Sequence, residues 1–253
     1  MRFSARFAIA LGLVLLAPAV SPAAAAEVEA VVASPDRLLV DTARDLSRKP
    51  VDVIRFAGIR PGARILDLYA GGGYYAELFA RLVEPGGDVI AHNNPAFLNF
   101  SADELAERNY GKRLPNVRTM VAENNKLKLV PSSFDLIWWS LGYHDLALDE
   151  PGWPRLDADK LRAELFAGLK PGGHLIIIDH RANPGEDGMI PGAPLHRVDP
   201  AKVIAELTAA GFALEATSDL LANPADDRKS SVFDRAIRGQ TDRFIFKFRK
   251  PAA

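Results

Sequence analysis

The sequence predicts an α/β fold, with seven strands in one mostly parallel sheet, the last strand antiparallel, and helices on both faces. Short apolar runs of strand length alternate with segments of helical periodicity, which is typical of βα units and a parallel sheet. The alternation continues for five βα steps and ends in two further strands. The sequence shows no internal repeat and no linker, so residues 27–253 are predicted to form a single domain.

The first strand and its helix lie in residues 63–82, ARILDLYAGGGYYAELFARL. An apolar run that contains Asp67 ends in the three glycines of residues 71–73, and apolar residues then recur at helical spacing. Glycines suit such a turn because they accept positive φ and let a ligand approach the backbone, while the helix offers free N–H groups at its start. The turn is a candidate ligand site, and the alternative is an ordinary connection that happens to be rich in glycine.

Residues 1–26 have the pattern of a secretory signal peptide. Arg2 and Arg6 precede an apolar run, and residues 23–26 are all alanine. Cleavage is expected after Ala26, because the apolar run is short for a membrane span of roughly 20 residues. We therefore expect a periplasmic or secreted protein without a stable membrane anchor, and cleavage takes the formal net charge from −1 to about −3.

Composition excludes several classes of function. The chain of 253 residues has no cysteine, so it has neither a disulfide framework nor a thiolate nucleophile. No basic stripe or run stands out, so no nucleic-acid partner is expected. The sequence does not indicate an oligomeric state.

A helical pattern in residues 34–59 is divided by Pro50. Its first part carries dense charge of both signs at helical spacing: Arg37, Asp41, Arg44, Asp45, Arg48 and Lys49. The simpler interpretation is a solvated face with i,i+4 pairs. The alternative is a flap of charges over the ligand site.

The other elements follow in order. Apolar runs predict strands at residues 88–92, 117–122, 134–139, 174–178, 212–218 and 243–248, and helical patterns predict helices at residues 101–109, 159–169 and 200–210. Ser101 with Glu104 is a plausible capping box, and Asp199 before Pro200 marks another helix start. Residues 182–199 form either a lid or a surface excursion. A short helical piece is expected within residues 221–239.

Polar residues follow the ends of the first five strands. They are the glycines 71–73, then Asn93, then Glu123 and Asn124, then residues 140–145, and finally residues 179–181. The carboxyl ends of parallel strands meet at one edge, where open α/β sheets bind ligands. These residues are therefore predicted to form one site.

This order of motifs resembles the class I S-adenosylmethionine-dependent methyltransferases over essentially the whole mature chain. The motifs that carry the resemblance are Asp67 with Gly71 and Gly73, Glu123 after the third strand, the FDLI strand at residues 134–137 and the LKPGG turn at residues 169–173. AGGGYYAE, GYHD, DHRA and TDRFIFKFRKP also look like an exported group of predicted methyltransferases in proteobacteria. The resemblance implies a Rossmann-like sheet and methyl transfer from S-adenosyl-L-methionine to a small-molecule acceptor outside the cytoplasm.

The resemblance also implies a set of cofactor-binding residues at the strand ends. We assign this role to Asp67, Tyr69, Gly71, Gly73, Asn93, Glu123, Asn124 and Ser140. In the family the position of Glu123 borders the adenine. Tyr69 departs from the family, which has a glycine there, and brings a phenol ring near the methionine end. Asn93 replaces the acid that grips the ribose hydroxyls, and an amide lacks the charge that strengthens such a bond.

Methyl transfer depends mainly on alignment of the acceptor, because the sulfonium is already activated. His144, with Asp145 beside it, is our candidate general base for a hydroxyl acceptor, because imidazole titrates near neutral pH. The alternative is that His144 only hydrogen-bonds a loop. His180 and Arg181 are second candidates, for contact with the substrate, and a structural hydrogen bond is their alternative.

Five residues carry donor atoms that bind metals: His144, Asp145, Asp179, His180 and His196. Their spacing is not a metal signature, and they meet only if the fourth and fifth strands converge with the loop at residues 182–199. We therefore predict no metal site. His92 and His174 adjoin apolar strands and are interpreted as structural.

Two other functions compete with methyl transfer. A non-catalytic small-molecule or nucleoside-binding protein on the same fold would explain Tyr69, Asn93 and export, since the cofactor is made in the cytoplasm. A nicotinamide oxidoreductase is disfavoured, because the chain lacks the G-x-G-x-x-G spacing and an acid that ends the second strand.

Overall fold

The computed structural model describes residues 22–148, 153, 156–186, 188–189 and 194–252. Within them, seven strands form one sheet in the order β3-β2-β1-β4-β5-β7-β6. The strands are β1 (Arg64–Leu68), β2 (Asp88–Asn93), β3 (Val117–Val121), β4 (Phe134–Ser140), β5 (Leu169–His180), β6 (Ala213–Ser218) and β7 (Arg243–Arg249). Neighbouring strands pair in parallel, except that β7 runs antiparallel to both β5 and β6. The predicted fold class is confirmed.

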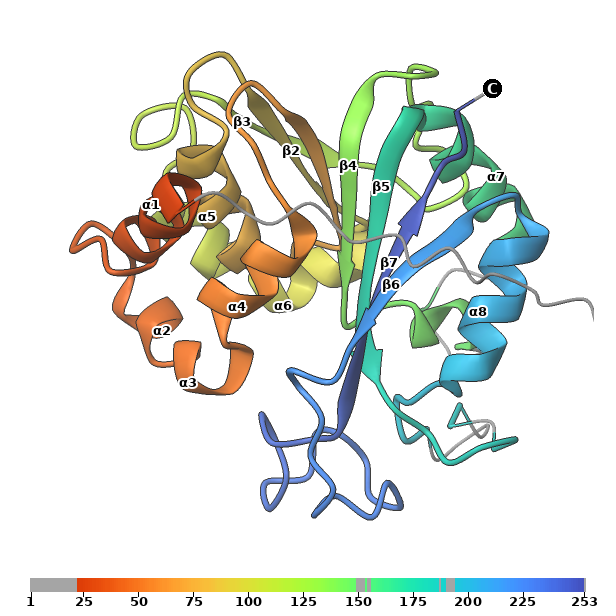
Figure 1. Cartoon of the computed structure of the whole chain (residues 1–253). Coiled ribbons are helices and arrows are strands. Elements are labelled where there is room, and N and C mark those ends of the chain that lie inside the picture. The colour runs from red at the N-terminus through yellow and green to blue at the C-terminus, as the bar shows by residue number, and fades with distance from the viewer. Residues whose placement is uncertain (1–21, 149–152, 154–155, 187, 190–193, 253) are drawn as a thin grey trace, which may run out of the picture.

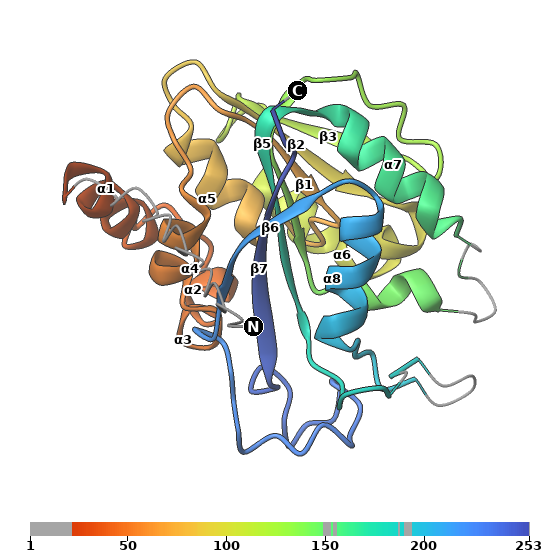
Figure 2. The ribbon, with the colours of Figure 1, turned by 45° about the vertical axis from the view of Figure 1, so that its right-hand side comes forward.

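Helices cover both faces of the sheet (Figures 1 and 2). One face carries α1 (Pro22–Val32), α4 (Pro50–Ala57) and α5 (Tyr74–Leu82), and the other carries α7 (Ala158–Gly168) and α8 (Pro200–Ala209). Successive residues of a strand point to opposite faces. Accordingly Trp138 packs under α5 against Phe79, while Trp139 lies in the other core against Tyr143. Burial on both faces is why these strands read as continuous apolar runs.

Helix α6 (Pro95–Arg108) begins six residues before its expected start at Ser101. The N-cap is Asn94, whose side-chain oxygen accepts a hydrogen bond from the Phe97 N–H at 2.8 Å. Pro95 then takes the first helical position, which suits its fixed φ. The capping box at Ser101 is therefore wrong, since the Ser101 hydroxyl donates to the Phe97 carbonyl inside the helix.

Two further sequence expectations are corrected. β5 begins at Leu169, so the LKPGG segment belongs to the strand rather than to a turn before it. Residues 221–239 form turns and no helix. Asn223 and Asp226 each accept a hydrogen bond from the backbone N–H two residues on, which satisfies the backbone without a helix.

Helix α1 spans the predicted cleavage point after Ala26, and residues 1–21 lie outside the described part of the chain. After that point Val28 is buried against the core. The signal peptide stays a prediction. Among the helices that the structure describes, none has the length and apolar character needed to cross a bilayer.

Candidate functional site

The glycine turn after β1 is held by Asn93 at the end of β2. The Asn93 side-chain oxygen accepts from the Gly71 N–H at 2.8 Å, and its NH2 group donates to the Gly71 carbonyl at 3.0 Å. A carboxylate has no proton to donate, so an acid here would lose the second bond. The amide at this position therefore shapes the turn, with both of its polar atoms engaged.

Buried polar atoms without partners gather at the ends of β1, β2 and β3. Within the described residues, the Glu123 Oε2 and both polar atoms of the Asn124 amide have no hydrogen-bond partner, and the Tyr69 hydroxyl and the Asn94 Nδ2 have none other than each other. Such atoms cost on the order of 1–3 kcal/mol each when left unpaired, and native proteins keep few of them. Their concentration at this edge, beside the glycine turn, indicates a place for a polar ligand.

Tyr69 links this group to the next strand end. Its ring packs against Phe97 and His92, with centroids 4.7 and 5.9 Å away, and it would collide with a Cβ on Gly142 at 2.4 Å. Burial raises the pKa of Tyr69 well above its usual value, and the Asp145 and Glu123 carboxylates add to the shift. The phenol therefore interacts electrostatically with both carboxylates. It lies between the polar residues that follow β1, β2 and β3 and those that follow β4.

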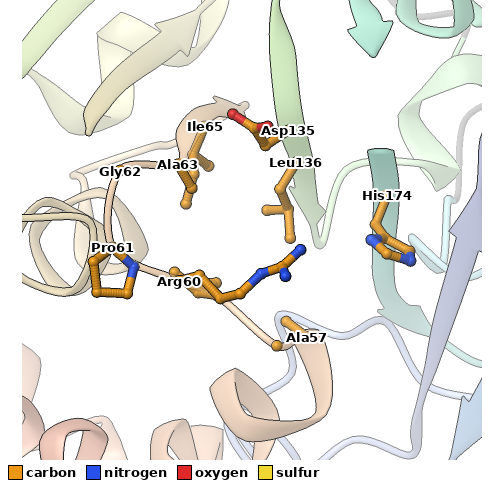
Figure 3. A pocket seen from close by; sticks show the side chains of 11 residues that line it. Ala57, Arg60, Pro61, Gly62, Ala63, Ile65, Asp135, Leu136 and His174 are labelled. Carbon is orange, nitrogen blue, oxygen red and sulfur yellow. The ribbon is translucent and has the colours of Figure 1, made fainter. Parts of the chain in front are cut away.

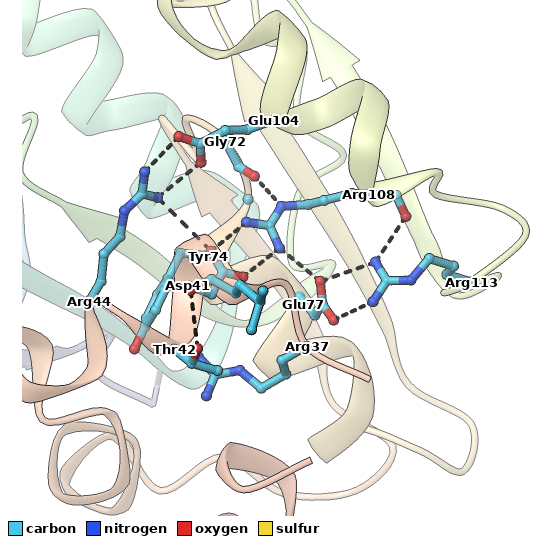
Figure 4. A network of polar contacts seen from close by, with 12 residues as sticks. Arg37, Asp41, Thr42, Arg44, Gly72, Tyr74, Glu77, Glu104, Arg108 and Arg113 are labelled. Carbon is cyan, nitrogen blue, oxygen red and sulfur yellow. Dashed lines mark hydrogen bonds and ion pairs between the residues drawn. The ribbon is translucent and has the colours of Figure 1, made fainter. Parts of the chain in front are cut away.

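The glycine turn is covered by charged side chains from α6 and from α2 (Leu39–Thr42) and the residues after it (Figure 4). Arg108 donates to the Gly72 carbonyl and to Asp41 and Glu77, both at 2.7–2.8 Å. Arg44 binds Glu104 through two hydrogen bonds of 2.6 and 2.9 Å. We call Asp41, Arg44, Glu104 and Arg108 the charged cover.

The side chains over the turn leave no space for a Cβ at Gly72 or Gly73, and the burial of Asp41 corrects the interpretation of residues 34–49 as a solvated face. A Cβ on Gly72 would lie 2.1 Å from the Glu104 carboxylate, and one on Gly73 would lie 2.0 Å from the Tyr110 hydroxyl. Asp41 is fully buried, as is Arg108. A solvated face is therefore wrong for Asp41, and the structure supports the alternative of a flap over the site. The segment before Pro50 also forms two separate short helices, α2 and α3 (Asp45–Arg48), rather than one.

Asp67, in β1, lies under the same turn. It is buried, and its Oδ2 has no hydrogen-bond partner in the described part of the chain. Burial raises the pKa of Asp67 to about 8, although a backbone hydrogen bond and the charges of Arg48 and Arg108 oppose the shift. The side chain is therefore mostly a neutral acid at pH 7.

At the ends of β4 and β5, histidines and carboxylates meet. His144, the first residue of a short 3-10 helix (η1, His144–Ala147), places Nδ1 2.7 Å from an Asp179 oxygen. Its Nε2 lies 3.3 Å from Asp145, and the His196 Nδ1 lies 3.5 Å from the same Asp145 oxygen. The ends of β4 and β5 and the loop after β5 therefore meet, as a site shared by these residues requires.

The charge of His144 does not fit the role of general base that we assigned to it. Burial lowers its pKa, but the Asp179 and Asp145 carboxylates outweigh burial and raise the pKa to about 10. The pKa of Asp145 is lowered to about 2, because the neighbouring histidines outweigh the effect of burial. At neutral pH, His144 therefore carries a proton and can donate a hydrogen bond but cannot accept a proton.

His180 lies beside this cluster. Its Nδ1 is 2.7 Å from the Thr241 hydroxyl, and its ring centroid is 5.9 Å from that of His144. Burial and the charge on His144 hold the pKa of His180 well below its usual value, so its imidazole is neutral. Arg181 pairs with Asp242 at 3.2 Å instead of joining the cluster. Ser140 ends β4, half-buried, opposite Ile178 of β5.

The two histidines interpreted as structural have structural contacts. The His92 Nε2 lies 2.9 Å from the Ala122 carbonyl, and burial lowers the pKa of His92 to about 4, so the neutral ring donates this bond. His174 faces Glu215 at 3.2 Å. These contacts agree with the interpretation.

Cavities of the described residues lie at both edges of the sheet. One of about 150 Å³ is bounded by His144, Tyr143, Arg162 and Glu206, so it opens beside the histidine cluster and has a polar wall. The other, of about 290 Å³, is bounded by the α4–β1 connection and by the starts of β4 and β5 (Figure 3). This second cavity is at the amino edge, away from the predicted site.

Some site residues carried no usable signal in the sequence. Arg108 and Gly72 are 36 residues apart, and Arg44 and Glu104 are 60 apart, so no local pattern relates them. Asn94 differs from these residues, because it does carry a local signal. It was overlooked because Asn-Pro is typical of a turn. An asparagine directly before a proline is also a common helix start, and that signal was available.

Comparison with known proteins gives one family. Residues 42–184 match the model of the ubiE/COQ5 methyltransferase family. A "Ubiquinone/menaquinone biosynthesis C-methyltransferase UbiE" from Pasteurella multocida (strain Pm70) is 33% identical over 124 residues, which is 49% of this chain and 42% of that protein. The chain therefore spans less than half the length of this relative.

Solved structures share the fold at low identity. A SAM-dependent methyltransferase from Aquifex aeolicus superposes with a TM-score of 0.58 at 21% identity, covering 83% of this chain and 95% of the other. The [4+2]-cyclase SpnF superposes with a TM-score of 0.55 at 20% identity, covering 84% of this chain and 81% of the other. At such identities the likeness concerns the fold alone.

Proposed function

The chain belongs to the ubiE/COQ5 methyltransferase family, and from this premise we propose that it transfers a methyl group from S-adenosyl-L-methionine to a small molecule outside the cytoplasm. Its fold is that of the class I methyltransferases, and S-adenosyl-L-methionine is the cofactor of the family. The cofactor supplies a methyl group that is already activated for transfer. The protein itself has to bind the cofactor and the acceptor, align them with each other and exclude water from the site.

The unpaired polar atoms at the strand ends carry the cofactor assignment. Glu123 and Asn124 offer an acceptor and an amide that pair with nothing among the described residues, as a site for a nucleoside requires. The residues present therefore fit the nucleoside part of the cofactor. At the glycine turn, Glu104 lies over Gly72, so the charged cover must move from Gly72 before a ligand contacts that backbone.

The acceptor is proposed to bind in the cavity beside His144. Its wall includes the Tyr143 hydroxyl, which donates to Glu206 at 2.8 Å, and Arg162, 3.2 Å from the same carboxylate. A polar acceptor suits this wall. The protonated His144 then serves as a hydrogen-bond donor that orients an acceptor oxygen, and the low pKa of His180 leaves a neutral imidazole beside it.

Titration calorimetry of the protein with S-adenosyl-L-methionine tests the cofactor assignment. We expect binding to the wild type, and about 10- to 100-fold weaker binding by the Glu123→Gln variant, because a hydrogen bond to a charged group contributes about 1.5–3 kcal/mol. Glu215→Gln is the matched control, since Glu215 of β6 pairs with His174 in the middle of β5, away from the carboxyl ends of the strands. No heat and no thermal shift at millimolar cofactor would disprove the assignment.

Binding without methyl transfer is the second candidate function. One observation favours it: Asn93 stands where the family has an acid, and both its polar atoms are engaged with Gly71. An unbiased screen with methyl-labelled cofactor separates the two functions. A methylated product excludes the binding-only function, and cofactor binding with no product over a broad metabolite extract supports it.

Export is proposed from residues 1–26, in which two arginines, an apolar run and four alanines follow one another. We expect a Gram-negative host that expresses the full chain to accumulate a periplasmic protein that begins at Glu27. Intact-mass spectrometry of the periplasmic fraction measures this. Arg2 and Arg6 changed together to glutamate should retain the uncleaved chain, and an unprocessed wild-type chain in the cytoplasm would contradict export.

A further inference from the structure

We propose that His144, Asp145 and His196 form a binding site for one divalent transition-metal ion of the zinc class. Each of the three side chains offers one ligand atom, and these atoms all lie within 4.8 Å of one another. They come from separate segments, the 3-10 helix after β4 and the loop after β5. The inference goes beyond the proposed function, since a metal can bind here whether or not the protein transfers a methyl group.

The spacing of the ligand atoms matches the edges of a metal's coordination shell. Ligands about 2.1 Å from a tetrahedral zinc ion are about 3.4 Å apart. The Asp145 oxygen lies 3.3 Å from the His144 Nε2 and 3.5 Å from the His196 Nδ1. Two of the three edges thus already have the required length, and the third, between the two imidazoles, is no longer than 4.8 Å.

A second carboxylate orients the first histidine. Asp179 accepts from the His144 Nδ1 at 2.7 Å and from the His144 backbone N–H at 2.9 Å. Asp179 thereby keeps one ring proton of His144 on Nδ1 and directs Nε2 toward Asp145. Metal binding displaces the second proton, on Nε2, so the hydrogen bond that we assign to His144 under the proposed function belongs to the metal-free form. Metal-binding histidines are typically held in this way by a carboxylate behind the ring.

His196 has a backbone conformation that is uncommon for a residue other than glycine. Its φ is +55°, in the left-handed region, and it is not a glycine. Backbone hydrogen bonds just before and after it hold the segment, from the Leu195 N–H to the Gly188 carbonyl at 2.7 Å and from the Val198 N–H to the His180 carbonyl at 2.9 Å. Its ring packs on Phe233, with centroids 4.8 Å apart. Such strained residues cluster at functional sites, where the strain positions a side chain.

Two imidazoles and one carboxylate are a common set of ligands for Zn²⁺ and related ions. Three protein ligands leave a further position for water or for an oxygen atom of a bound molecule. The cavity of about 150 Å³ reaches His144, so a small ligand can approach the cluster from there.

Titration of the metal-free full chain with Co²⁺ tests the proposal, because Co²⁺ reports its own coordination by visible absorption. We expect one Co²⁺ per chain, displaced by Zn²⁺. His196→Gln and Asp145→Asn should each weaken binding by at least about 100-fold, and Asp179→Asn, which acts through His144, by about 10- to 100-fold. Circular dichroism without metal checks that the variants fold.

His174→Ala is the matched control, because His174 also faces a carboxylate, Glu215, at 3.2 Å, without a second histidine. It should bind Co²⁺ like the wild type. Absence of stoichiometric binding, or equal binding by wild type and His196→Gln, overturns the proposal. Failure here is distinct from failure of the proposed function, since cofactor titration is carried out without metal.

Discussion

Replacing Arg108 by methionine is expected to lower the free energy of unfolding by about 3–5 kcal/mol, the usual cost of removing one partner from a buried ion pair. Arg108 is fully buried and lies 2.7–2.8 Å from the carboxylates of Asp41 and Glu77, which are also fully buried. Without the guanidinium, Asp41 has no other charged partner at hydrogen-bond distance in the described part of the chain, since Arg44 is 3.9 Å away. Glu77 keeps Arg113 at 2.9 Å, so Asp41 bears most of the loss.

Urea unfolding at neutral pH measures this effect, and two further variants show its origin. Arg118→Met is the control, because the exposed pair of Arg118 with Asp88 should contribute less than about 1 kcal/mol. Arg108→Met with Asp41→Asn should recover part of the stability, since the second change removes the uncompensated charge. A loss of about 1 kcal/mol or less in Arg108→Met, equal to that of the control, would contradict a buried network.

The Asp67→Asn variant is expected to become more stable than the wild type as the pH rises, by a difference on the order of 5 kcal/mol between pH 4 and pH 8. Burial raises the pKa of Asp67 from 3.8 to about 8. In this window the folded state keeps a proton on Asp67 that the unfolded state releases, so the contribution of Asp67 to stability is fully present below about pH 4 and is lost as the pH rises to 8. At 1.36 kcal/mol per pKa unit the effect has the stated size, and asparagine abolishes it.

Urea unfolding of both proteins at several pH values between 4 and 9 measures the difference. Asp135→Asn is the control of opposite sign. Burial raises the pKa of Asp135, but the Arg64 N–H and Lys170 outweigh it and lower the pKa. The stabilisation from Asp135 is therefore constant above about pH 4 and is lost only in more acidic solution. A difference between Asp67→Asn and wild type that stays constant with pH would rule out a neutral Asp67.

The strands of the sheet were predictable because each is marked by a short apolar run of consecutive residues. Strands such as β4, FDLIWWS, are buried on both faces and so are apolar at nearly every position. The connections gave equally local signals, such as Asp199 before Pro200 at the start of α8. Where prediction failed, at the start of α6 and in residues 221–239, side chains of Asn94, Asn223 and Asp226 decide the backbone through single hydrogen bonds.

The residue types at this edge were predictable, and their contacts and charges were not. His144, Asp145 and His196 carry metal-binding donor atoms, but their spacing predicts no metal site, since 52 positions separate His144 from His196 in the chain. Whether His144 is a base depends on Asp179, which reaches it from the next strand. A pKa is a sum over neighbours within a few ångströms, and sequence distance does not report them.

The sequence by itself determined the α/β class, the alternation of strands and helices along the chain, and the edge at which polar residues collect. Each of these follows from burial patterns and from the direction of parallel strands, which repeat along the chain. Only the tertiary structure decided that Asn93 clamps Gly71, that Arg108 and Glu104 lie on the glycine turn, and that two histidines share Asp145. The physical reason is that hydrogen bonds and ion pairs act over about 3–4 Å in space, whatever number of residues lies between the partners.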